Sequence, residues 1–219
     1  MILKKLIMIL GCLTILMGRQ VVATEQIILG INNTNNEGFY YEDNELKGEL
    51  GRQLQCALNE SNIAYKSRLL PLTRLMVMLE SGGIDIAVGL AQTEQRDNSG
   101  IYTKPIVELS FALVSGKSAF KSSEEARGKT IATVRASNMV AMIKALNAKV
   151  YELSDYLQVI SMLDNKRIDG AVLPVNIIAA LNEERKQSFN YIILQTERIG
   201  FYISQRSDQV DMLLLRISV

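Results

Sequence analysis

The sequence of 219 residues is 48% hydrophobic and 21% charged, which is typical of a folded globular chain rather than a disordered or fibrous one. Its formal net charge of +1 gives no basic field that would attract nucleic acid, so we expect no nucleic-acid partner. The chain has no histidine and two cysteines, so we expect no metal site, no other cofactor and no histidine-dependent hydrolase triad.

The N-terminal segment 1–23 has the layout of an export signal. Lys4 and Lys5 precede an apolar run over 6–17, and the small residue Ala23 stands where signal peptidase would cleave. The run is shorter than the roughly 20 residues that a membrane-spanning helix needs. We therefore expect a periplasmic protein that starts at Thr24 after cleavage.

A competing interpretation takes residues 9–12 as a lipobox, with a lipid on Cys12. Because the apolar run continues beyond this cysteine, the sequence favours cleavage after Ala23. Only Cys56 would then remain, so no intrachain disulfide could form. Its apolar neighbours predict that Cys56 is buried.

Segments with strand-like and helix-like patterns alternate along the rest of the chain, which predicts an α/β fold with largely parallel sheets. Strands are expected at 26–30, 63–70, 84–88, 109–115, 130–134, 149–153, 191–194 and 200–204. Helices are expected at 49–60, 72–81, 139–147, 155–164 and 174–185, with a partial helix at 212–215. Ser154 is the predicted cap of the fourth helix.

Two stretches of the chain echo one another. The sequence MLESGGIDIAV at 78–88 matches MLDNKRIDGAV at 162–172 in its Met-Leu-acid start, its Ile-Asp pair and its Ala-Val end. Each copy predicts a helix end, a tight turn and a strand. Coincidence is one explanation, because such units are common in α/β proteins. We favour two similar lobes, and we expect no single sheet running through both echoes.

The stretch 84–105, where an apolar strand ends in a polar loop, contains the best single candidate for a ligand contact. Arg96 lies in this loop, and a guanidinium can hold a carboxylate in bidentate fashion. A strand end that opens into a loop also frees backbone N–H groups that can assist. The alternative is a solvated surface arginine, which is the usual state of a lone arginine in a loop.

Within this stretch, Gly89, Thr93 and Arg96 form the pattern G-x-x-x-T-x-x-R, followed by Tyr-Thr and a proline at 102–105. The pattern resembles the ligand loop of the bacterial extracellular solute-binding proteins of family 3, the periplasmic receptors of amino-acid ABC importers. Four further segments resemble that family in the right order, at 38–48, 70–89, 124–137 and 165–173. Compared with the family, the chain is divergent and short at its C-terminus.

The resemblance implies a two-lobed α/β periplasmic binding protein (Venus flytrap) fold of type II. Lobe one would comprise 24–106 and 205–219, lobe two 117–194, and the hinge crossovers 107–116 and 195–204. It also implies a monomer that captures a small, amino-acid-like solute bearing a carboxylate and delivers it to an ABC permease.

The resemblance assigns roles to individual residues as well. Arg96 would bind the ligand carboxylate, assisted by Thr93 and by the backbone of Ala91 and Gln92. Ser137 stands where the family has a Gly-Thr turn in lobe two, and it would face Arg96 across the cleft. It keeps a hydroxyl near a helix N-terminus, which suits an anion.

Other positions depart from the family. Its first-lobe acid and aromatic residue fall near Asn33 and Asn36, and we expect Asn36 and Phe39 to line the pocket. Pro174 replaces the lobe-two acid that holds the α-ammonium of an amino acid. The carboxylate half of the site is therefore kept and the ammonium half is not, which implies a carboxylate ligand without a free ammonium group.

Two other functions remain open on the sequence. One is a sensor or orphan module that binds a ligand without serving a transporter. The other is a periplasmic lyase like the cyclohexadienyl dehydratases, in which Glu37 or Glu94 would act as the acid. Because loop glutamates are usually solvated, we expect no enzymatic activity.

Overall fold

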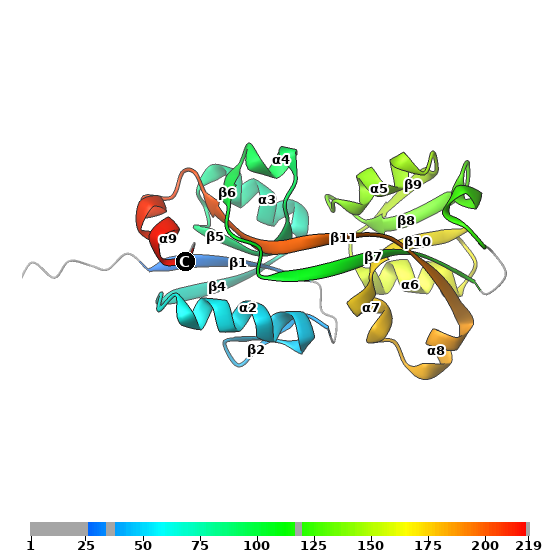
Figure 1. Ribbon diagram of the computed structural model, residues 1–219, viewed down its shortest axis with the longest axis horizontal. Coiled ribbons are helices and arrows are strands. Elements are labelled where there is room, and N and C mark those ends of the chain that lie inside the picture. Colours follow the sequence, from blue (N-terminus) through cyan, green and yellow to red (C-terminus); the bar gives the residue numbers. More distant parts are fainter. Residues whose placement is uncertain (1–25, 34–37, 117–119, 218–219) are drawn as a thin grey trace, which may run out of the picture.

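A computed structural model describes residues 26–33, 38–116 and 120–217 (Figure 1). The expected signal peptide at 1–23 and the expected pocket residue Asn36 lie outside these ranges. Within them, the helices are all too short or too polar to cross a membrane.

In the described part of the chain, nine strands form the main sheet and two short strands form a separate hairpin. The nine are β1 (Ile27–Asn32), β4 (Tyr65–Leu70), β5 (Ile86–Ala91), β6 (Gly100–Tyr102), β7 (Val107–Gly116), β8 (Thr130–Val134), β9 (Lys149–Leu153), β10 (Gly170–Pro174) and β11 (Phe189–Ser204). The hairpin consists of β2 (Tyr40–Glu42) and β3 (Glu45–Lys47). The order in the main sheet is β4-β1-β5-β11-β7-β10-β8-β9, with β6 beside β11.

The helices alternate with these strands along the chain. They are α2 (Gly48–Glu60), α3 (Leu72–Ser81), α4 (Glu94–Asp97), α5 (Met139–Ala145), α6 (Tyr156–Asp164), α7 (Val175–Ala179), α8 (Glu183–Ser188) and α9 (Val210–Ile217), with a 3-10 turn at Ser123–Ala126. The predicted α/β alternation is confirmed.

The molecule has two lobes joined by β7 and β11, which run antiparallel across the gap between them (Figure 1). The C-terminal part of β11 pairs with β5 and β6, while β7 pairs with β10. Because the two long strands contribute to both lobes, all nine strands are hydrogen-bonded in one continuous order. The expectation that no single sheet runs through both echoes is therefore wrong in this respect.

In the first lobe, helices cover both faces of the sheet (Figure 1). Helix α2 buries Leu50, Leu54 and Leu58, as its 3.6-residue period predicts. Helix α3 packs on the opposite face, where its leucines meet Ala87 of β5. The prediction that Cys56 is buried is wrong, because this cysteine lies on the outer face of α2 and is exposed.

The sequence echo corresponds to two equivalent pieces of structure. Helix α3 ends at Gly82, with φ of 77°, and helix α6 is followed by Lys166, with φ of 54°. The next residue in each copy, Gly83 or Arg167, donates its N–H to the carbonyl at the start of the echo, at 2.8 and 2.9 Å. Both helices thus end in a Schellman-type turn before a strand.

Besides shifts of a few residues at several element ends, three predicted features differ from the structure. The cap of α6 is Asp155 rather than Ser154, because the Asp155 carboxylate accepts the N–H of Gln158 at 2.9 Å. The helix expected over 174–185 is divided into α7 and α8, and Asn182 caps the second one. The two strands expected at 191–194 and 200–204 are parts of the single strand β11.

Candidate ligand-binding site

The end of β5 is bent by a β-bulge at Gly89. In the pairing of β5 with β11, Leu90 faces Gly200 and Val88 faces Phe201, which leaves Gly89 without a partner in this ladder. Its φ of 75° lies in the left-handed region that favours glycine. The first residue of the G-x-x-x-T-x-x-R pattern therefore turns the strand end toward the gap between the lobes.

The loop after the bulge is held by Thr93 and Tyr202. Thr93 caps the short helix α4, because its Oγ1 accepts the N–H of Arg96 at 3.2 Å. The Thr93 N–H donates to the Tyr202 hydroxyl at 3.1 Å, and that hydroxyl donates to Asp97 at 2.7 Å. Burial raises the pKa of Tyr202, so the phenol keeps its proton at neutral pH. Strand β11 thus fixes the loop that carries Arg96.

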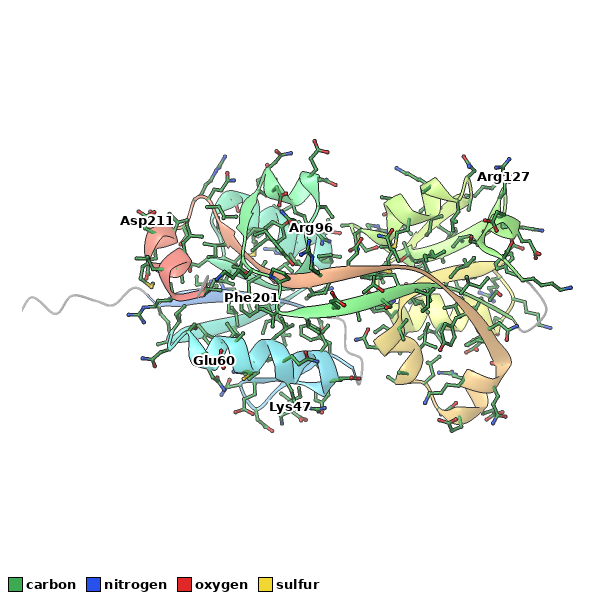
Figure 2. All side chains as sticks on the ribbon, viewed as in Figure 1. Lys47, Glu60, Arg96, Arg127, Phe201 and Asp211 are labelled. Carbon is green, nitrogen blue, oxygen red and sulfur yellow. The ribbon has the colours of Figure 1, made fainter. Side chains whose placement is uncertain are left out.

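Arg96 is 6% exposed and points from the first lobe toward the crossing strands (Figure 2). Its Nη1 donates to the Ala91 carbonyl oxygen at 2.8 Å, and within the described residues its other side-chain N–H groups have no hydrogen-bond partner. Burial lowers the pKa of Arg96 from its usual range, and nearby Tyr202, Glu197 and Tyr156 oppose that shift. A buried guanidinium without a carboxylate partner is costly, so the site favours an anion that would supply one.

The second lobe presents Ser137 at the start of the segment that leads into α5. Ala136 before it has φ of 60°, which is unusual for a residue with a Cβ. The Ser137 side chain is buried, and its Oγ has no hydrogen-bond partner in the described part of the chain. Asn138 next to it donates to the carboxylate of Glu197 on β11, which ties this turn to the crossing strand.

Two further side chains of the second lobe meet the same space. Tyr156 is the first residue of α6 and is buried, and burial raises the pKa of its phenol while the charge of Arg96 lowers it. The phenol therefore stays protonated and can donate a hydrogen bond. Asn176 lies on α7 after Pro174, and its buried Oδ1 has no partner among the described residues.

These groups surround one cavity of about 70 Å³ between the lobes. Most of its lining is apolar. The lining residues are Asn32, Phe39, Leu50, Leu72, Gly89, Leu90, Ala91, Arg96, Leu109, Phe111, Ser137, Asn138, Met139, Tyr156, Pro174, Asn176, Ile177 and Ile199. Among these residues Arg96 carries the single charge.

The cavity brings together four of the residues selected from the sequence: Arg96, Ala91, Ser137 and Phe39. Thr93 acts through its cap on α4 and does not line the cavity. Gln92 is exposed, donates to Asp97 at 3.2 Å and lines a separate groove beside the crossing strands.

Sequence reasoning missed Tyr156, Asn176 and Asn138. No motif marks these residues, and each belongs to a segment whose pattern predicts only an ordinary helix or turn. The available signal was their position: Asn138 and Tyr156 stand just after strands of the second lobe, as does Asn176. Ligands of α/β proteins bind at this edge of a sheet.

No family model and no curated protein sequence matches the chain. Solved structures do match it. One is the arginine-, lysine-, histidine-binding protein ArtJ from Geobacillus stearothermophilus, at 16% identity and a TM-score of 0.76, covering 88% of both chains. Another is the ligand-binding core of GluR0 in complex with L-glutamate, at 15% identity and a TM-score of 0.73, covering 89% of this chain and 91% of that one.

A third match is a histidine kinase sensor domain with similarity to periplasmic binding proteins. It is 18% identical with a TM-score of 0.75, and the match covers 89% of this chain and 87% of that one. Identities this low establish the fold alone. The chain has the two-lobed α/β fold of periplasmic binding proteins, as the sequence predicted.

Proposed function

We propose that the protein is a periplasmic solute-binding protein that captures a small carboxylate between its two lobes. The observation that carries this proposal is Arg96, a buried guanidinium at the interlobe cavity whose one side-chain hydrogen bond within the described residues is to Ala91. Its free N–H groups match the two oxygens of a carboxylate. Ser137 and the protonated Tyr156 approach the same space from the opposite lobe.

The proposed mechanism is lobe closure around the ligand. The ladder between β7 and β11 has a register shift between Ile193 and Gln195, and the pairing of β11 with β5 shifts between Gly200 and Phe201. We propose that these irregularities delimit the hinge, with the crossovers at 107–116 and 195–204 and the lobes bounded as the sequence predicts. A ligand that touches both lobes would then favour the closed state.

The partner that we propose is the permease of an ABC importer, and we propose export by a signal peptide cleaved after Ala23. ArtJ, which shares the fold, is named for binding arginine, lysine and histidine, and this supports the capture of a small solute. N-terminal sequencing of the periplasmic protein should start at Thr24. A lipid-modified Cys12 would contradict the cleavage site.

A sensor function is the second candidate, because a histidine kinase sensor domain has the same fold. The genes beside this one separate the two: a permease and an ATPase indicate an importer, and a signalling protein indicates a sensor. We propose a binding rather than a catalytic role in either case. Glu94, one of the two candidate acids, is exposed on α4 and does not line the cavity, and Glu37 lies outside the described residues.

A thermal-shift screen against amino acids, organic acids and small peptides tests the proposal. We expect at least one carboxylate to raise the melting temperature of the parent protein. Arg96→Ala should cost about 2 to 5 kcal/mol of binding free energy, because it removes one partner of a desolvated pair. Arg68→Ala, at an exposed position on β4, is the matched control. Unchanged binding by Arg96→Ala would refute the proposal.

A further inference from the structure

Two buried oxygens of the second lobe face the cavity without a hydrogen-bond partner in the described part of the chain. They are Ser137 Oγ and Asn176 Oδ1. Leaving such an atom unpaired is costly, so each marks a place where a ligand group would form a hydrogen bond. The hydroxyl of Ser137 can donate or accept, whereas an amide oxygen only accepts.

Asn176 lies close to the first lobe, because a Cβ placed on Gly38 would lie 2.8 Å from Asn176 Nδ2. Within the described residues, Oδ1 is the buried amide atom of Asn176 that lacks a partner, and an amide oxygen accepts hydrogen bonds. The ligand therefore needs a hydrogen-bond donor near Asn176, in addition to the carboxylate that Arg96 would bind.

The charges around the cavity indicate what kind of donor this is. Arg96 is the one charged residue among the described residues of the lining. Glu197 is close enough to influence Arg96, but its carboxylate accepts hydrogen bonds from Asn138 and from Gln195, the latter at 2.5 Å, and it does not line the cavity. An ammonium group would bring a second positive charge next to the guanidinium, with no acid among the described lining residues to pair with it, whereas a hydroxyl is neutral.

The rest of the lining limits the size and polarity of the ligand. Phe39, Leu50, Phe111, Met139 and Ile177 surround the polar groups with hydrocarbon. The cavity of about 70 Å³ is about half the size of the roughly 150 Å³ cavity that binds benzene, so it favours a small ligand with a short aliphatic body.

We propose that the site takes a short hydroxy monocarboxylate, with its carboxylate on Arg96 and its hydroxyl donating to Asn176 Oδ1. This inference rests on the proposed function and specifies its ligand class. Lactate is a suitable probe, because propionate lacks only its hydroxyl and alanine carries an ammonium group in place of that hydroxyl.

Calorimetric titration of the purified protein with these three compounds tests the inference. We expect lactate to bind about tenfold more tightly than propionate, the value of one hydrogen bond to a buried acceptor, and alanine to bind more weakly than either. If propionate or alanine bound with the same affinity as lactate, the hydroxy-acid inference would be overturned. Carboxylate capture by Arg96 would still stand.

Variants of Asn176 make the test specific. Asn176→Leu should reduce the affinity for lactate by a larger factor than the affinity for propionate, whereas Asn165→Leu, at the exposed end of α6, should change neither. Asn176→Asp introduces the missing counter-charge and should raise the affinity for alanine relative to lactate. Equal losses for lactate and propionate in Asn176→Leu would contradict the assigned hydrogen bond.

The outcomes also separate this inference from the proposed function. If none of the three compounds binds but a larger carboxylate binds in an Arg96-dependent manner, the ligand class is wrong and solute capture stands. If no carboxylate in the wider screen binds, both are wrong.

Discussion

Asp85 in the first lobe and Asp169 in the second make the same hydrogen bond. The Oδ2 atom of each accepts a backbone N–H from the neighbouring strand, that of Ile28 in β1 or Thr130 in β8, and both distances are 2.7 Å. Each aspartate also donates its own N–H to the carbonyl of that partner, at 2.9 and 3.0 Å. The Ile-Asp pair of the echo therefore joins each lobe's helix-turn-strand unit to the adjacent strand.

The two aspartates should differ in their contribution to stability. Asp85 also accepts the Ser207 hydroxyl at 2.5 Å and is partly buried, whereas Asp169 is exposed. We expect Asp85→Ala to lower the free energy of unfolding by about 2 to 3 kcal/mol and Asp169→Ala by about 1 kcal/mol. Urea unfolding of both variants measures the difference. Equal losses would show that the Ser207 bond contributes nothing.

Substitutions of the two left-handed turn residues of the echo, Gly82 and Lys166, should change the stability of the protein in opposite directions. Gly82→Ala places a Cβ in the left-handed region and within 3.0 Å of the Arg206 carbonyl oxygen, so we expect a loss of about 1 to 2 kcal/mol or more. Lys166→Gly relieves the same strain at the equivalent position. After subtraction of the conformational entropy that glycine loses on folding, we expect the free energy of unfolding to rise by about 0.5 to 1 kcal/mol. Thermal unfolding checks both, and a loss in Lys166→Gly would contradict the account.

The Tyr156 hydroxyl should contribute to carboxylate binding. Because the phenol remains protonated beside Arg96, it can donate to the same carboxylate from the opposite lobe. Tyr156→Phe should weaken the binding of lactate and propionate by about the same factor, roughly five- to tenfold. Tyr151→Phe on the exposed face of β9 is the control. Titration showing equal affinity in Tyr156→Phe and the parent would remove this residue from the site.

Glu197 should make the stability of the protein depend on pH. Burial raises its pKa, and hydrogen bonds from Gln195 and Asn138 and the charge of Arg96 oppose the rise. The folded protein therefore holds this proton to a higher pH than the unfolded chain, whose glutamates titrate near about 4.3. Between the pKa of the unfolded glutamate and the higher pKa of folded Glu197, folding takes up a proton. The contribution of Glu197 to the free energy of unfolding therefore falls as the pH rises through this range.

Glu197→Gln removes that dependence. We expect the melting temperature of the variant, relative to that of the parent, to increase as the pH is raised from about 4 to 7. Scanning calorimetry at a series of pH values checks it. Glu94→Gln on the exposed surface of α4 is the control, and a constant difference across the series would contradict the assignment.

Patterns that act over a few residues predicted much of the fold. The bounds of α3, β8 and β9 match the predicted segments, because apolar periodicity, Pro71 before α3 and the glycines after it are local signals. Arg96, which the sequence selected, lines the interlobe cavity, and its role in binding stays a prediction. Sequence reasoning failed at Cys56, whose apolar neighbours Leu54 and Leu58 lie on the opposite face of α2.

The rest of the site depends on how distant segments meet. Asn176 becomes a cavity residue because α7 packs against Gly38 of the other lobe, and no pattern within either segment encodes that contact. The fusion of the strands into one sheet has the same origin. It follows from the pairing of β7 with β11, whose residues are far apart in the sequence.

The continuity of the strands through both lobes also has a consequence for the order of folding during synthesis. The second lobe's pairings involve β7 to β10 and the first part of β11, and can be complete once Ile193 has emerged. The first lobe acquires its pairing between β5 and β11 only with residues 199–203, after closure of a long loop. Until then the edge of β5 lacks its β11 partner, and an unpaired strand edge of this kind is open to pairing with other chains.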